Sequence, residues 1–416
     1  MFRRYAISEI GDIISGATPK TTVPDNFGGE IPWLTPADLS GYTGKYISHG
    51  ARNLTRQGYD SCSTHLMPAG TVLLSSRAPI GYVAIAKNEI CTNQGFKSIV
   101  PKTFVNSEFL YYQLKSLKNT LQNLGSGTTF KELSAKKLAT VQVVIPSLEE
   151  QKSIVSKIEE LFSRLDASVA ELQTAKEKLK VYRQAVLKEV FEGAFTHHQM
   201  IDIDLDWVSV EETMTLPTIP PEWRNIALSK LGELGRGKSK HRPRNDPALF
   251  EDGKYPFIQT GDVKAAKRYI TTCAKKYGNF GLQQSKLWPK GTLCITIAAN
   301  IAETAFLGID ACFPDSIVGF TPSEYIIPEY IKHFIESQKV RLWAFAPATA
   351  QKNINLDTLE NLVVPYCSIE EQHQVVAEIE SKMTVCDNIE ETIEATLQQT
   401  EALRQSILKR AFEGEL

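Results

Sequence analysis

The sequence predicts a mixed α+β protein that arose by tandem duplication, with two α/β bodies that are each followed by a long helix. Three observations support this fold class. The run Arg183 to Gly193 recurs at Arg404 to Gly414 with seven of eleven positions identical, at a constant offset of 221 in the numbering. Apolar residues at heptad spacing lead into each run, and short β-rich stretches precede each heptad region. One repeat therefore covers about residues 7–195 and the other about 228–416.

Length and composition fit a globular protein of several domains. The chain has 416 residues, of which 42% are hydrophobic and 23% are charged, and this length predicts two to four domains. No apolar run approaches the roughly 20 residues that span a bilayer, and the first residues lack the apolar core of a signal peptide. We therefore expect a cytoplasmic protein with no membrane contact. The seven cysteines are scattered, which predicts free thiols and no metal site.

The two bodies are expected at residues 1–147 and 196–367, and the second includes an acidic, proline-containing linker at its start. Short β-rich runs bounded by Gly or Pro alternate there with helical patterns, which is typical of α/β domains. The clearest expected strands are Gly70–Ser76, Gly81–Ala86 and Gly291–Ala298, and one helix is expected in each body, over 104–124 and 327–345.

Two long amphipathic helices are expected at 148–195 and 368–416. Their apolar residues recur at alternating spacings of three and four, which indicates a coiled-coil seam. Gly193 and Gly414 are expected at their C-terminal ends. The alternative is two unrelated core helices. The expected seam residues are Ile154, Ile158, Leu161, Leu165, Leu172, Leu179 and Val186 in the first helix, with Ser168, Ala175 and Tyr182 completing its spacing, and Val375, Ile379, Cys386, Ile389, Ile393, Leu403 and Ile407 in the second, interrupted by Lys382, Thr396 and Thr400.

Charge is distributed unevenly between helices and bodies. Residues 149–195 and 368–416 together hold 12 Lys and Arg against 20 Asp and Glu, which leaves 34 basic against 28 acidic residues elsewhere. Such basic bodies suit contact with a phosphate backbone, whereas solvated loop charge is the plainer interpretation of any single cluster. The basic residues concentrate in the second body, at Arg236, Lys238, Lys240, Arg242 and Arg244 and again at Lys264, Lys267 and Arg268.

The run GELGRGKS (Gly232 to Ser239) fits the spacing of a phosphate-binding loop. Its context opposes that function, because the preceding residues are not a buried apolar strand and Pro243 and Pro247 oppose a following helix. The matching run GDIISGAT keeps the glycines, with Gly16 opposite Gly237, but has no lysine opposite Lys238. We therefore expect a turn shared by the repeats and no nucleotide site. The sequence also lacks the spacings typical of hydrolase and metal centres.

The chain resembles the specificity subunits of type I restriction–modification systems over essentially its whole length. The motifs that carry the resemblance are VVIPSLEEQ from Val143, LVVPYCSIEEQ from Leu362, the two tail runs, and PPEWRNIALSKLGEL from Pro220. The resemblance implies that the bodies are two target recognition domains, held apart by an antiparallel coiled coil with a pseudo-two-fold axis. One departure is the polar content of the second helix at the expected seam.

The resemblance also implies the partners and an absence of catalysis in this chain. Specificity subunits of this family carry out no chemistry and bind no cofactor themselves. They bind double-stranded DNA, two methyltransferase (modification) subunits that use S-adenosylmethionine, and two motor and nuclease (restriction) subunits that use ATP and Mg. An asymmetric bipartite target is expected, because the two bodies differ.

Polar residues in loops between the matched motifs are the candidate DNA contacts, since Arg, Lys, Gln and Asn read base edges and contact phosphates. For each residue a role in the loop itself is the alternative. An interaction protein without DNA contacts and an ATPase are the two rival functions. Besides the basic cluster 236–244, the candidates are Ser75, Ser76, Arg77, Thr128, Thr129 and Lys131 in the first body, and Gln259, Thr260, Lys264, Asn300, Thr349, Gln351 and Lys352 in the second.

Overall fold

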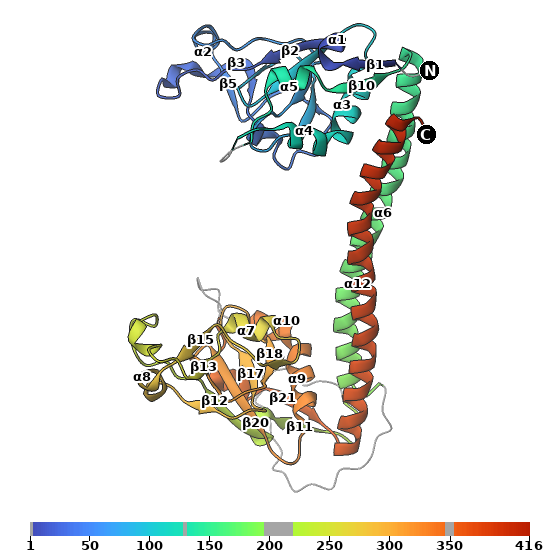
Figure 1. Ribbon diagram of the computed structural model, residues 1–416. Coiled ribbons are helices and arrows are strands. Elements are labelled where there is room, and N and C mark those ends of the chain that lie inside the picture. The colour runs from blue at the N-terminus through green and yellow to red at the C-terminus, as the bar shows by residue number, and fades with distance from the viewer. Residues whose placement is uncertain (1–2, 128–130, 195–218, 346–352) are drawn as a thin grey trace. The chain divides into compact units, whose positions relative to one another are not determined.

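The computed structural model describes residues 3–127, 131–194, 219–345 and 353–416, and these divide into two compact units. Unit 1 comprises residues 1–173 and 394–416, and unit 2 comprises residues 174–393. Each unit therefore contains one body, the first half of the long helix that follows it, and the second half of the other long helix (Figure 1). The mixed α+β fold with two long helices, expected from the tandem repeat, is confirmed.

In unit 1 the central sheet has five strands in the order β2-β9-β6-β7-β4, next to a three-stranded sheet β5-β3-β8 and the pair β1-β10. The expected strands at 70–76 and 81–86 are confirmed as β6 and β7. The elements of this body are β1 Arg3–Ala6, α1 Ile7–Ile10, β2 Gly11–Ser15, η1 Pro24–Asn26, β3 Phe27–Leu34, η2 Pro36–Leu39, β4 Tyr46–Ile47, β5 Arg52–Leu54, α2 Arg56–Asp60, β6 Val72–Leu74, β7 Val83–Ala86, β8 Cys91–Thr92, β9 Lys97–Pro101, α3 Ser107–Ser116, α4 Lys118–Leu124, α5 Ala135–Ala139 and β10 Gln142–Ile145.

Unit 2 repeats this topology with one more strand, β16, at the edge of its second sheet; its sheets are β12-β20-β17-β18-β14, β15-β13-β19-β16 and β11-β21. Even the register is kept, because Gly11 pairs with Pro101 in unit 1 and Gly232 pairs with Pro322 in unit 2. The elements of the second body are β11 Arg224–Ala227, η3 Leu228–Lys230, β12 Gly232–Arg236, η4 Pro247–Leu249, β13 Tyr255–Phe257, α7 Thr260–Ala265, β14 Tyr269–Ile270, β15 Lys275–Tyr277, α8 Asn279–Gln283, β16 Leu287–Trp288, β17 Leu293–Thr296, β18 Thr304–Leu307, β19 Ala311–Cys312, β20 Ile317–Pro322, α9 Pro328–Ser337, α10 Lys339–Phe345, α11 Leu356–Glu360 and β21 Val363–Tyr366.

Two expectations about local structure are corrected. The single helix expected in each body is two helices, because the chain turns at Leu117 (φ −88°, ψ 7°) and at Gln338 (φ −86°, ψ 1°). This conformation lies between the helical and extended regions and redirects the second helix. In the glycine-containing runs that were expected to form a shared turn, the first five residues are strands β2 and β12, and Gly16 and Gly237 directly follow these strands. The seven cysteines are free thiols, as expected.

The two long helices are α6, Leu148–Phe191, and α12, Ile369–Glu413. Each begins with a buried glutamine of the repeated E-E-Q motif. Gln151 donates hydrogen bonds to the carbonyl oxygens of Phe104 and Pro146, both at 2.9 Å, and accepts one from the backbone N–H of Asn106 at 2.7 Å. The bonds with Phe104 and Asn106 attach the start of α6 to the loop before α3, and the bond to Pro146 holds the residues that lead into α6.

Gln372 makes the same three hydrogen bonds in unit 2. Its amide donates to the carbonyl oxygens of Tyr325 and Cys367 at 3.2 and 2.9 Å, and accepts from the backbone N–H of Ile327 at 2.8 Å. Every partner stands at the common offset of 221 from its counterpart in unit 1. The E-E-Q motif therefore encodes a fixed attachment of helix to body, and both glutamines are fully buried.

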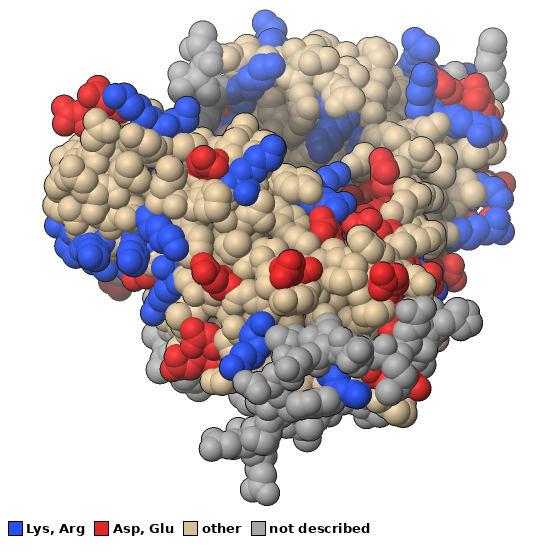
Figure 2. Space-filling view, turned by 90° about the horizontal axis from the view of Figure 1, so that it is seen from below, with Lys and Arg blue, Asp and Glu red and all other residues tan. Residues whose placement is uncertain are grey.

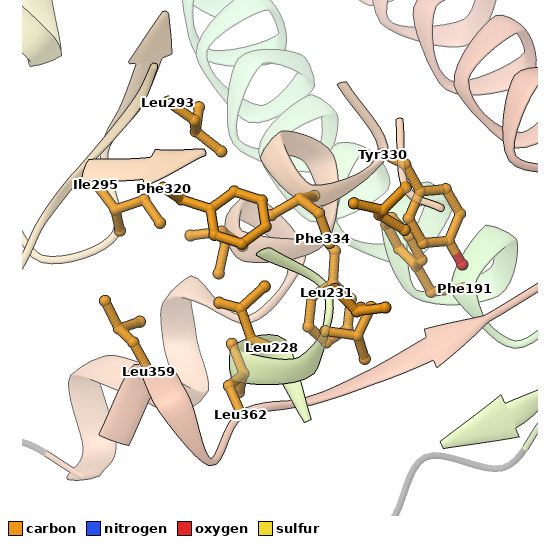
Figure 3. Close-up of a cluster of buried hydrophobic side chains, with 14 of the residues drawn as sticks. Phe191, Leu228, Leu231, Leu293, Ile295, Phe320, Tyr330, Phe334, Leu359 and Leu362 are labelled. Atoms are coloured by element: carbon orange, nitrogen blue, oxygen red, sulfur yellow. The ribbon is translucent and has the colours of Figure 1, made fainter. Parts of the chain in front are cut away.

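The end of each long helix packs into the body of the other repeat. In unit 2, the Phe191 ring lies 5.1 Å from that of Tyr330 and 5.3 Å from that of Phe334 (Figure 3). In unit 1, the Phe412 ring lies 5.2 Å from that of Phe109. The repeated tail run is therefore an anchor for the opposite body, a role that burial of its aromatic ring explains.

The expected glycine ends of both helices are confirmed. Gly193 and Gly414 each have φ +83°, the left-handed conformation that glycine adopts readily at a helix end. The backbone N–H groups of Ala194 and Glu415 bond to the carbonyl oxygens of Glu189 and Arg410, which closes the last turn of each helix.

Pairing of α6 with α12 is antiparallel within each unit, but the seam differs in part from the expected one. One set of expected seam residues, spaced seven apart along each helix, is half-buried or buried as predicted. Each member in α6 has its counterpart in α12 at the offset of 221. They are Ile158, Leu165, Leu172, Leu179 and Val186 in α6, and Ile379, Cys386, Ile393, Thr400 and Ile407 in α12.

Beyond the first turns of each helix, the alternate seam positions lie one residue later than expected. Ile389 and Leu403 have 44% and 48% of their surface exposed, and Ser168, Ala175 and Tyr182 are also exposed. The neighbouring residues are less exposed, because the helix presents a face shifted by one position. Those neighbours are Phe162, Val169, Lys176 and Arg183 in α6, and Met383, Glu390, Leu397 and Arg404 in α12. The other expected residues, Ile154, Leu161 and Val375, are half-buried, half-buried and buried.

Charged seam residues are paired across the helices. In unit 2, Arg183 bonds Asp387 at 2.6 Å and Glu390 at 3.2 Å, and in unit 1, Arg404 bonds Asp166. Arg183 corresponds to Arg404, and Asp166 to Asp387, by the same offset. The ion pair therefore occurs once in each unit, as two-fold related pairing of duplicated helices requires.

Candidate nucleic-acid interface

Three segments meet beyond the end of the central sheet in unit 1, namely residues 75–81, 93–96 and the described residues 126–127 and 131–133. The backbone N–H of Ser76 bonds to the Gly95 carbonyl at 2.7 Å, and the N–H of Leu133 bonds to the Ser76 carbonyl at 2.8 Å. The first loop is thereby held between the other two. We call this arrangement the loop junction of unit 1.

Unit 2 builds its loop junction with the same hydrogen bonds. The backbone N–H of Ile297 bonds to the Ser316 carbonyl at 3.0 Å, and the N–H of Ile354 bonds to the Ile297 carbonyl at 3.0 Å. All these positions correspond to those of unit 1 by the common offset of 221. The sequence therefore specifies one backbone frame for the loops of both bodies.

Side chains on this shared frame differ in charge. In unit 1, Arg77 Nη1 lies 3.5 Å and Lys97 Nζ lies 3.9 Å from the carboxylate of Glu132. Burial lowers the pKa of Lys97, although Glu132 acts in the opposite direction. The corresponding residues of unit 2 are Ala298, Val318 and Asn353, which carry no charge. The two junctions thus present different chemistry to a ligand.

Two predicted contact residues of unit 1 are enclosed by the fold. Ser75 and Ser76 are fully buried. The Ser75 hydroxyl donates to the Pro79 carbonyl at 2.7 Å and accepts from the backbone N–H of Tyr82 at 2.8 Å, and Thr296 accepts in the same way from Glu303 in unit 2. These hydroxyls are unavailable to a ligand in this conformation, because the fold encloses them.

The remaining predicted residues of unit 1 include two that are accessible. Arg77 is half-buried and Lys131 is exposed, and both lie on the loops of the junction. Thr128 and Thr129 lie outside the described residues. Lys97 and Glu132 were missed by sequence reasoning. Glu132 directly follows the predicted contact Lys131, and Lys97 lies two residues after Gly95 of the junction, and this closeness in sequence is the signal that could have found them.

The basic segment of unit 2, residues 236–244, is tied to the junction loop around Asp315. Arg244 Nη2 lies 2.9 Å from both carboxylate oxygens of Asp315, and Arg236 Nε bonds to the Asp315 carbonyl. These contacts bring a cluster of cations to the loops that carry Ser316 and Ile297. Unit 1 has no comparable run of basic residues at residues 15–23.

Lys238, Lys240 and Arg242 of this segment are exposed, as are Arg236 and Arg244. The backbone here is held by bonds from Lys240 N–H to the Gln284 carbonyl at 3.2 Å and from the Ser285 hydroxyl to the Lys238 carbonyl at 2.8 Å. Figure 2 shows Lys and Arg side chains at the left of the view and also along its right and upper edges, with Asp and Glu side chains among them and near the centre. A cluster of exposed cations such as this segment attracts a polyanion.

The structure gives the glycines of GELGRGKS a reason other than phosphate binding. A Cβ atom at Gly237 would lie 2.3 Å from the Pro314 carbonyl oxygen, and one at Gly16 would lie 2.0 Å from that of Thr92. Both glycines are therefore required by close approach of two chain segments. Strand β12 is followed by irregular chain and a 3₁₀ turn at Pro247–Leu249, so the run has no helix N-terminus to receive a phosphate.

The other predicted residues of unit 2 are spread over two elements. Gln259 is exposed before α7, Thr260 begins that helix, and Lys264 is exposed near its end. Asn300 lies in the junction loop, half-buried, where its carbonyl accepts the Thr296 hydroxyl. Thr349, Gln351 and Lys352 lie outside the described residues.

Neither a metal centre nor a membrane span is found in the part of the chain that the structure describes. No group of three or more His, Cys, Asp or Glu side chains there is arranged to hold a metal ion. None of the helices there is long and apolar enough to cross a bilayer. What the loop junctions offer is hydrogen-bonding groups and charge on a fixed frame.

Comparison with known proteins identifies the family to which this duplicated fold belongs. The family model of the type I restriction modification DNA specificity domain matches residues 2–177 and 220–399. The chain belongs to this family.

Individual relatives agree with this assignment. The chain is 38% identical to the type I restriction enzyme MjaIX specificity subunit of Methanocaldococcus jannaschii over 259 residues, which are 61% of this chain and 56% of that protein. It is 26% identical to the EcoBI specificity subunit of Escherichia coli over 423 residues, covering 99% of this chain and 86% of the relative. A solved structure described as the basis of complex assembly and conformational transition of the type I R-M system shares the fold, with a TM-score of 0.70, 20% identity, and coverage of 100% and 98% of the two chains.

Proposed function

We propose that this chain is the non-catalytic DNA-specificity subunit of a type I restriction–modification enzyme. Each body reads one half of an asymmetric bipartite target, and the paired helices set the distance between the halves. The single observation that carries this proposal is the shared loop junction, which keeps the same backbone hydrogen bonds in both units and changes the charge of its side chains. A frame of constant geometry with variable side chains is what two readers of different sequences require.

The proposed binding mode separates positioning from reading. Exposed cations such as Lys238 and Lys240 contact phosphates, which gives affinity without sequence preference. Arg77 and Lys131 in unit 1, and Asn300 in unit 2, lie on the junction loops and are the proposed base-reading residues among those described. Arg and Asn suit this role because their side chains form paired hydrogen bonds with guanine and adenine edges in the major groove.

The chemistry of the assembly belongs to other subunits in this proposal. Two modification subunits methylate adenine with S-adenosylmethionine, and two restriction subunits use ATP and Mg. Family membership and the name that the relatives share support the proposal of these partners, and their cofactors are part of the same proposal. This chain supplies the DNA contacts and the scaffold, in the cytoplasm of the cell.

The decisive experiment is methylated-base sequencing of DNA from cells that carry this chain together with its modification subunit. The expected result is one asymmetric, bipartite motif with a gap of constant length. Arg77→Ala should relax the preference at one position of a single half-site and leave the other half-site unchanged. Methylation without a motif, or no salt-sensitive DNA binding by the complex, would favour an interaction protein instead.

The nucleotide alternative has its own test in the purified chain. Lys238→Ala should not change ATP binding, because the proposal assigns no nucleotide site to this chain. The same variant should weaken DNA binding of the complex about equally for all sequences and reduce its salt dependence. ATP binding that disappears in Lys238→Ala would contradict the proposal.

A further inference from the structure

One lysine joins three segments of unit 1. Lys45 precedes β4, and its Nζ bonds to the carboxylates of Glu108 and Glu159. Glu108 lies in the first turn of α3 in the body, and Glu159 lies on the long helix α6. The Tyr46 hydroxyl also donates to Glu108 at 2.7 Å. We call Lys45, Glu108 and Glu159 the latch of unit 1.

Unit 2 has the same arrangement around an arginine. Arg268 bonds Glu329 Oε1 at 2.9 Å and Glu380 Oε1 at 3.0 Å. Glu329 lies in the first turn of α9, and Glu380 lies on α12. We call Arg268, Glu329 and Glu380 the latch of unit 2.

The latch has been kept while the residues around it have changed. Its glutamates correspond at the offset of 221 that the repeated motifs share, whereas its cations stand at an offset of 223 and differ in type. The cation lies before the strand at the sheet edge that pairs in parallel with β7 or β18. Strands β4 and β14 also stand at an offset of 223, so the cation directly precedes the equivalent strand in each unit. The positive charge has been kept at this position although the residue differs, which indicates that the contact itself is needed.

Electrostatics explain how the latch holds. Burial disfavours the charged form of Lys45, but its hydrogen bonds to Glu108 and Glu159 outweigh burial and raise its pKa. Burial likewise opposes the charged form of Glu108, and the bonds from Lys45 and Tyr46 nevertheless lower the pKa of this carboxyl. Without the cation, two carboxylates from body and helix would face one another and repel. The latch therefore favours one body-to-helix arrangement.

The position of the latch gives it control over an angle. The amide of Gln151 attaches the start of α6 to the body, and Glu159 lies eight residues further along, about 12 Å at 1.5 Å per residue. Gln372 and Glu380 repeat this spacing in unit 2. With one attachment point, the body could rotate relative to the helix about that point. A second point along the same helix fixes the angle between body and helix.

We propose that Lys45 and Arg268 are positioning residues that fix the angle of each recognition body on its spacer helix, and thereby the number of base pairs between the two half-sites. This inference rests on the proposed function. The latches do not read bases, so their loss changes the tolerated gap length and not the sequence of either half-site.

The test uses the complex of the full chain with its modification subunits. Methylation rates are measured on targets with the preferred gap and with gaps one base pair shorter or longer. In Lys45→Gln and Arg268→Gln, the ratio of the methylation rates at preferred and altered gaps should fall by about 10- to 100-fold, since a misplacement of about 1 Å can change a rate by about 100-fold. Discrimination against substitutions within each half-site should remain unchanged.

Matched variants separate the latch from general damage. Lys45→Arg and Arg268→Lys should retain gap discrimination, because each repeat already uses the other's cation. The triple variant Lys45→Gln/Glu108→Gln/Glu159→Gln should discriminate better than Lys45→Gln alone, since it removes the repulsion between carboxylates. Arg56→Gln, which breaks the exposed pair with Asp60 in the same body, should have no effect on gap discrimination.

A distance measurement tests the latch without relying on DNA reading. Spin labels at Ser48 in the body and Ser163 on α6 should show a wider distance distribution in Lys45→Gln than in the parent complex. An unchanged distribution, or a widened one with unchanged gap discrimination, would overturn the positioning role. If the parent complex methylates no bipartite target, the proposed function fails, while the distance distribution still decides whether the latch holds the body.

Discussion

Units 1 and 2 share the contacts that join each body to the long helices, and they differ in the side chains that their loop junctions present. Four features recur at corresponding positions in the two units. They are the glutamine clamps (the hydrogen bonds of Gln151 and Gln372), the tail anchors (the packed rings of Phe191 and Phe412), the latches, and the hydrogen bonds of the loop junctions. The junction side chains do not recur, since Arg77, Lys97 and Glu132 are replaced by Ala298, Val318 and Asn353. The two copies of the duplicated sequence have therefore kept the geometry that places each body and changed the surface that each body presents.

The tail anchors should give the largest difference between the units. Phe191→Ala should destabilise unit 2 by about 3–5 kcal/mol, because it removes a buried ring that packs against two others. Phe412→Ala should cost about 2–3 kcal/mol, since Phe412 is half-buried and packs on one ring. Denaturant titration measures both, with the exposed Val181→Ala as control. Equal losses would show that the two anchors are equivalent.

The glutamine clamps should behave alike in the two units. Gln151→Ala and Gln372→Ala should each cost about 2–3 kcal/mol, because each leaves two carbonyl groups and one N–H without their buried partner. Gln151→Glu should cost at least as much, since a carboxylate cannot donate to Phe104 and Pro146. The same denaturant titrations provide the measurement. A loss in one unit only would contradict the equivalence of the two attachments.

The stability of the two units should depend differently on acid. Unit 2 has the half-buried carboxylate of Glu336 on α9, whereas unit 1 has Lys115 at the corresponding position of α3. Burial raises the pKa of Glu336, but His333 and Lys332 outweigh it and lower this pKa to about 2 from 4.5. A depressed pKa stabilises the folded state above pH 4.5, and this contribution is lost as pH falls toward 2. We expect a loss of about 1–2 kcal/mol in unit 2 over this range.

Glu336→Gln provides the control for this pH dependence. The variant should be less stable than the parent at pH 7 and should show a shallower loss of stability between pH 4.5 and pH 2. The corresponding residue of unit 1 is Lys115, so Lys115→Gln should leave the acid dependence of unit 1 unchanged. An equally steep loss in Glu336→Gln would assign the acid sensitivity to other groups.

The smallest effects are expected within the junction loop of unit 1. Ser75→Ala should cost about 1–2 kcal/mol, because the Ser75 hydroxyl bonds to Pro79 and Tyr82. Ser76→Ala should be close to neutral, since the buried Ser76 hydroxyl has no hydrogen-bond partner among the residues described. Thermal unfolding resolves the difference. If Ser76→Ala is the more harmful change, its hydroxyl has a partner or a role that this structure does not account for.

Prediction of the coiled-coil seam succeeded at every seventh position. Between these positions it succeeded at Ile154, Leu161 and Val375, near the helix starts, and failed further along each helix. Placing apolar residues at the seam selected Ile389, Leu403 and Tyr182, which are exposed. The structure instead uses Arg183 and Arg404, whose long aliphatic stems cover the seam while their charged ends reach acidic residues of the facing helix. Sequence spacing does not reveal such a partner, because the pairing joins residues that are far apart in the chain.

Prediction of the candidate interface was limited in the same way. Polar residues in loops were selected as a group, but Ser75 and Ser76 are enclosed by the fold, and Lys97 and Glu132 were overlooked. Whether a loop side chain faces solvent depends on the segments that pack beside it. In unit 1 these are the loop of Gly95 and the loop of Leu133, and both are distant in sequence from Ser76.

The sequence by itself determined the duplication, the types of the main elements, the heptad regions and the glycine ends of the helices. These features depend on identity at a constant offset and on local periodicity, which are written directly in the chain. The tertiary structure alone decided that each helix end anchors in the opposite body, that one cation joins body to helix in each unit, and that three loops form each junction. These features are contacts between segments that only folding brings together, and their geometry sets their energy.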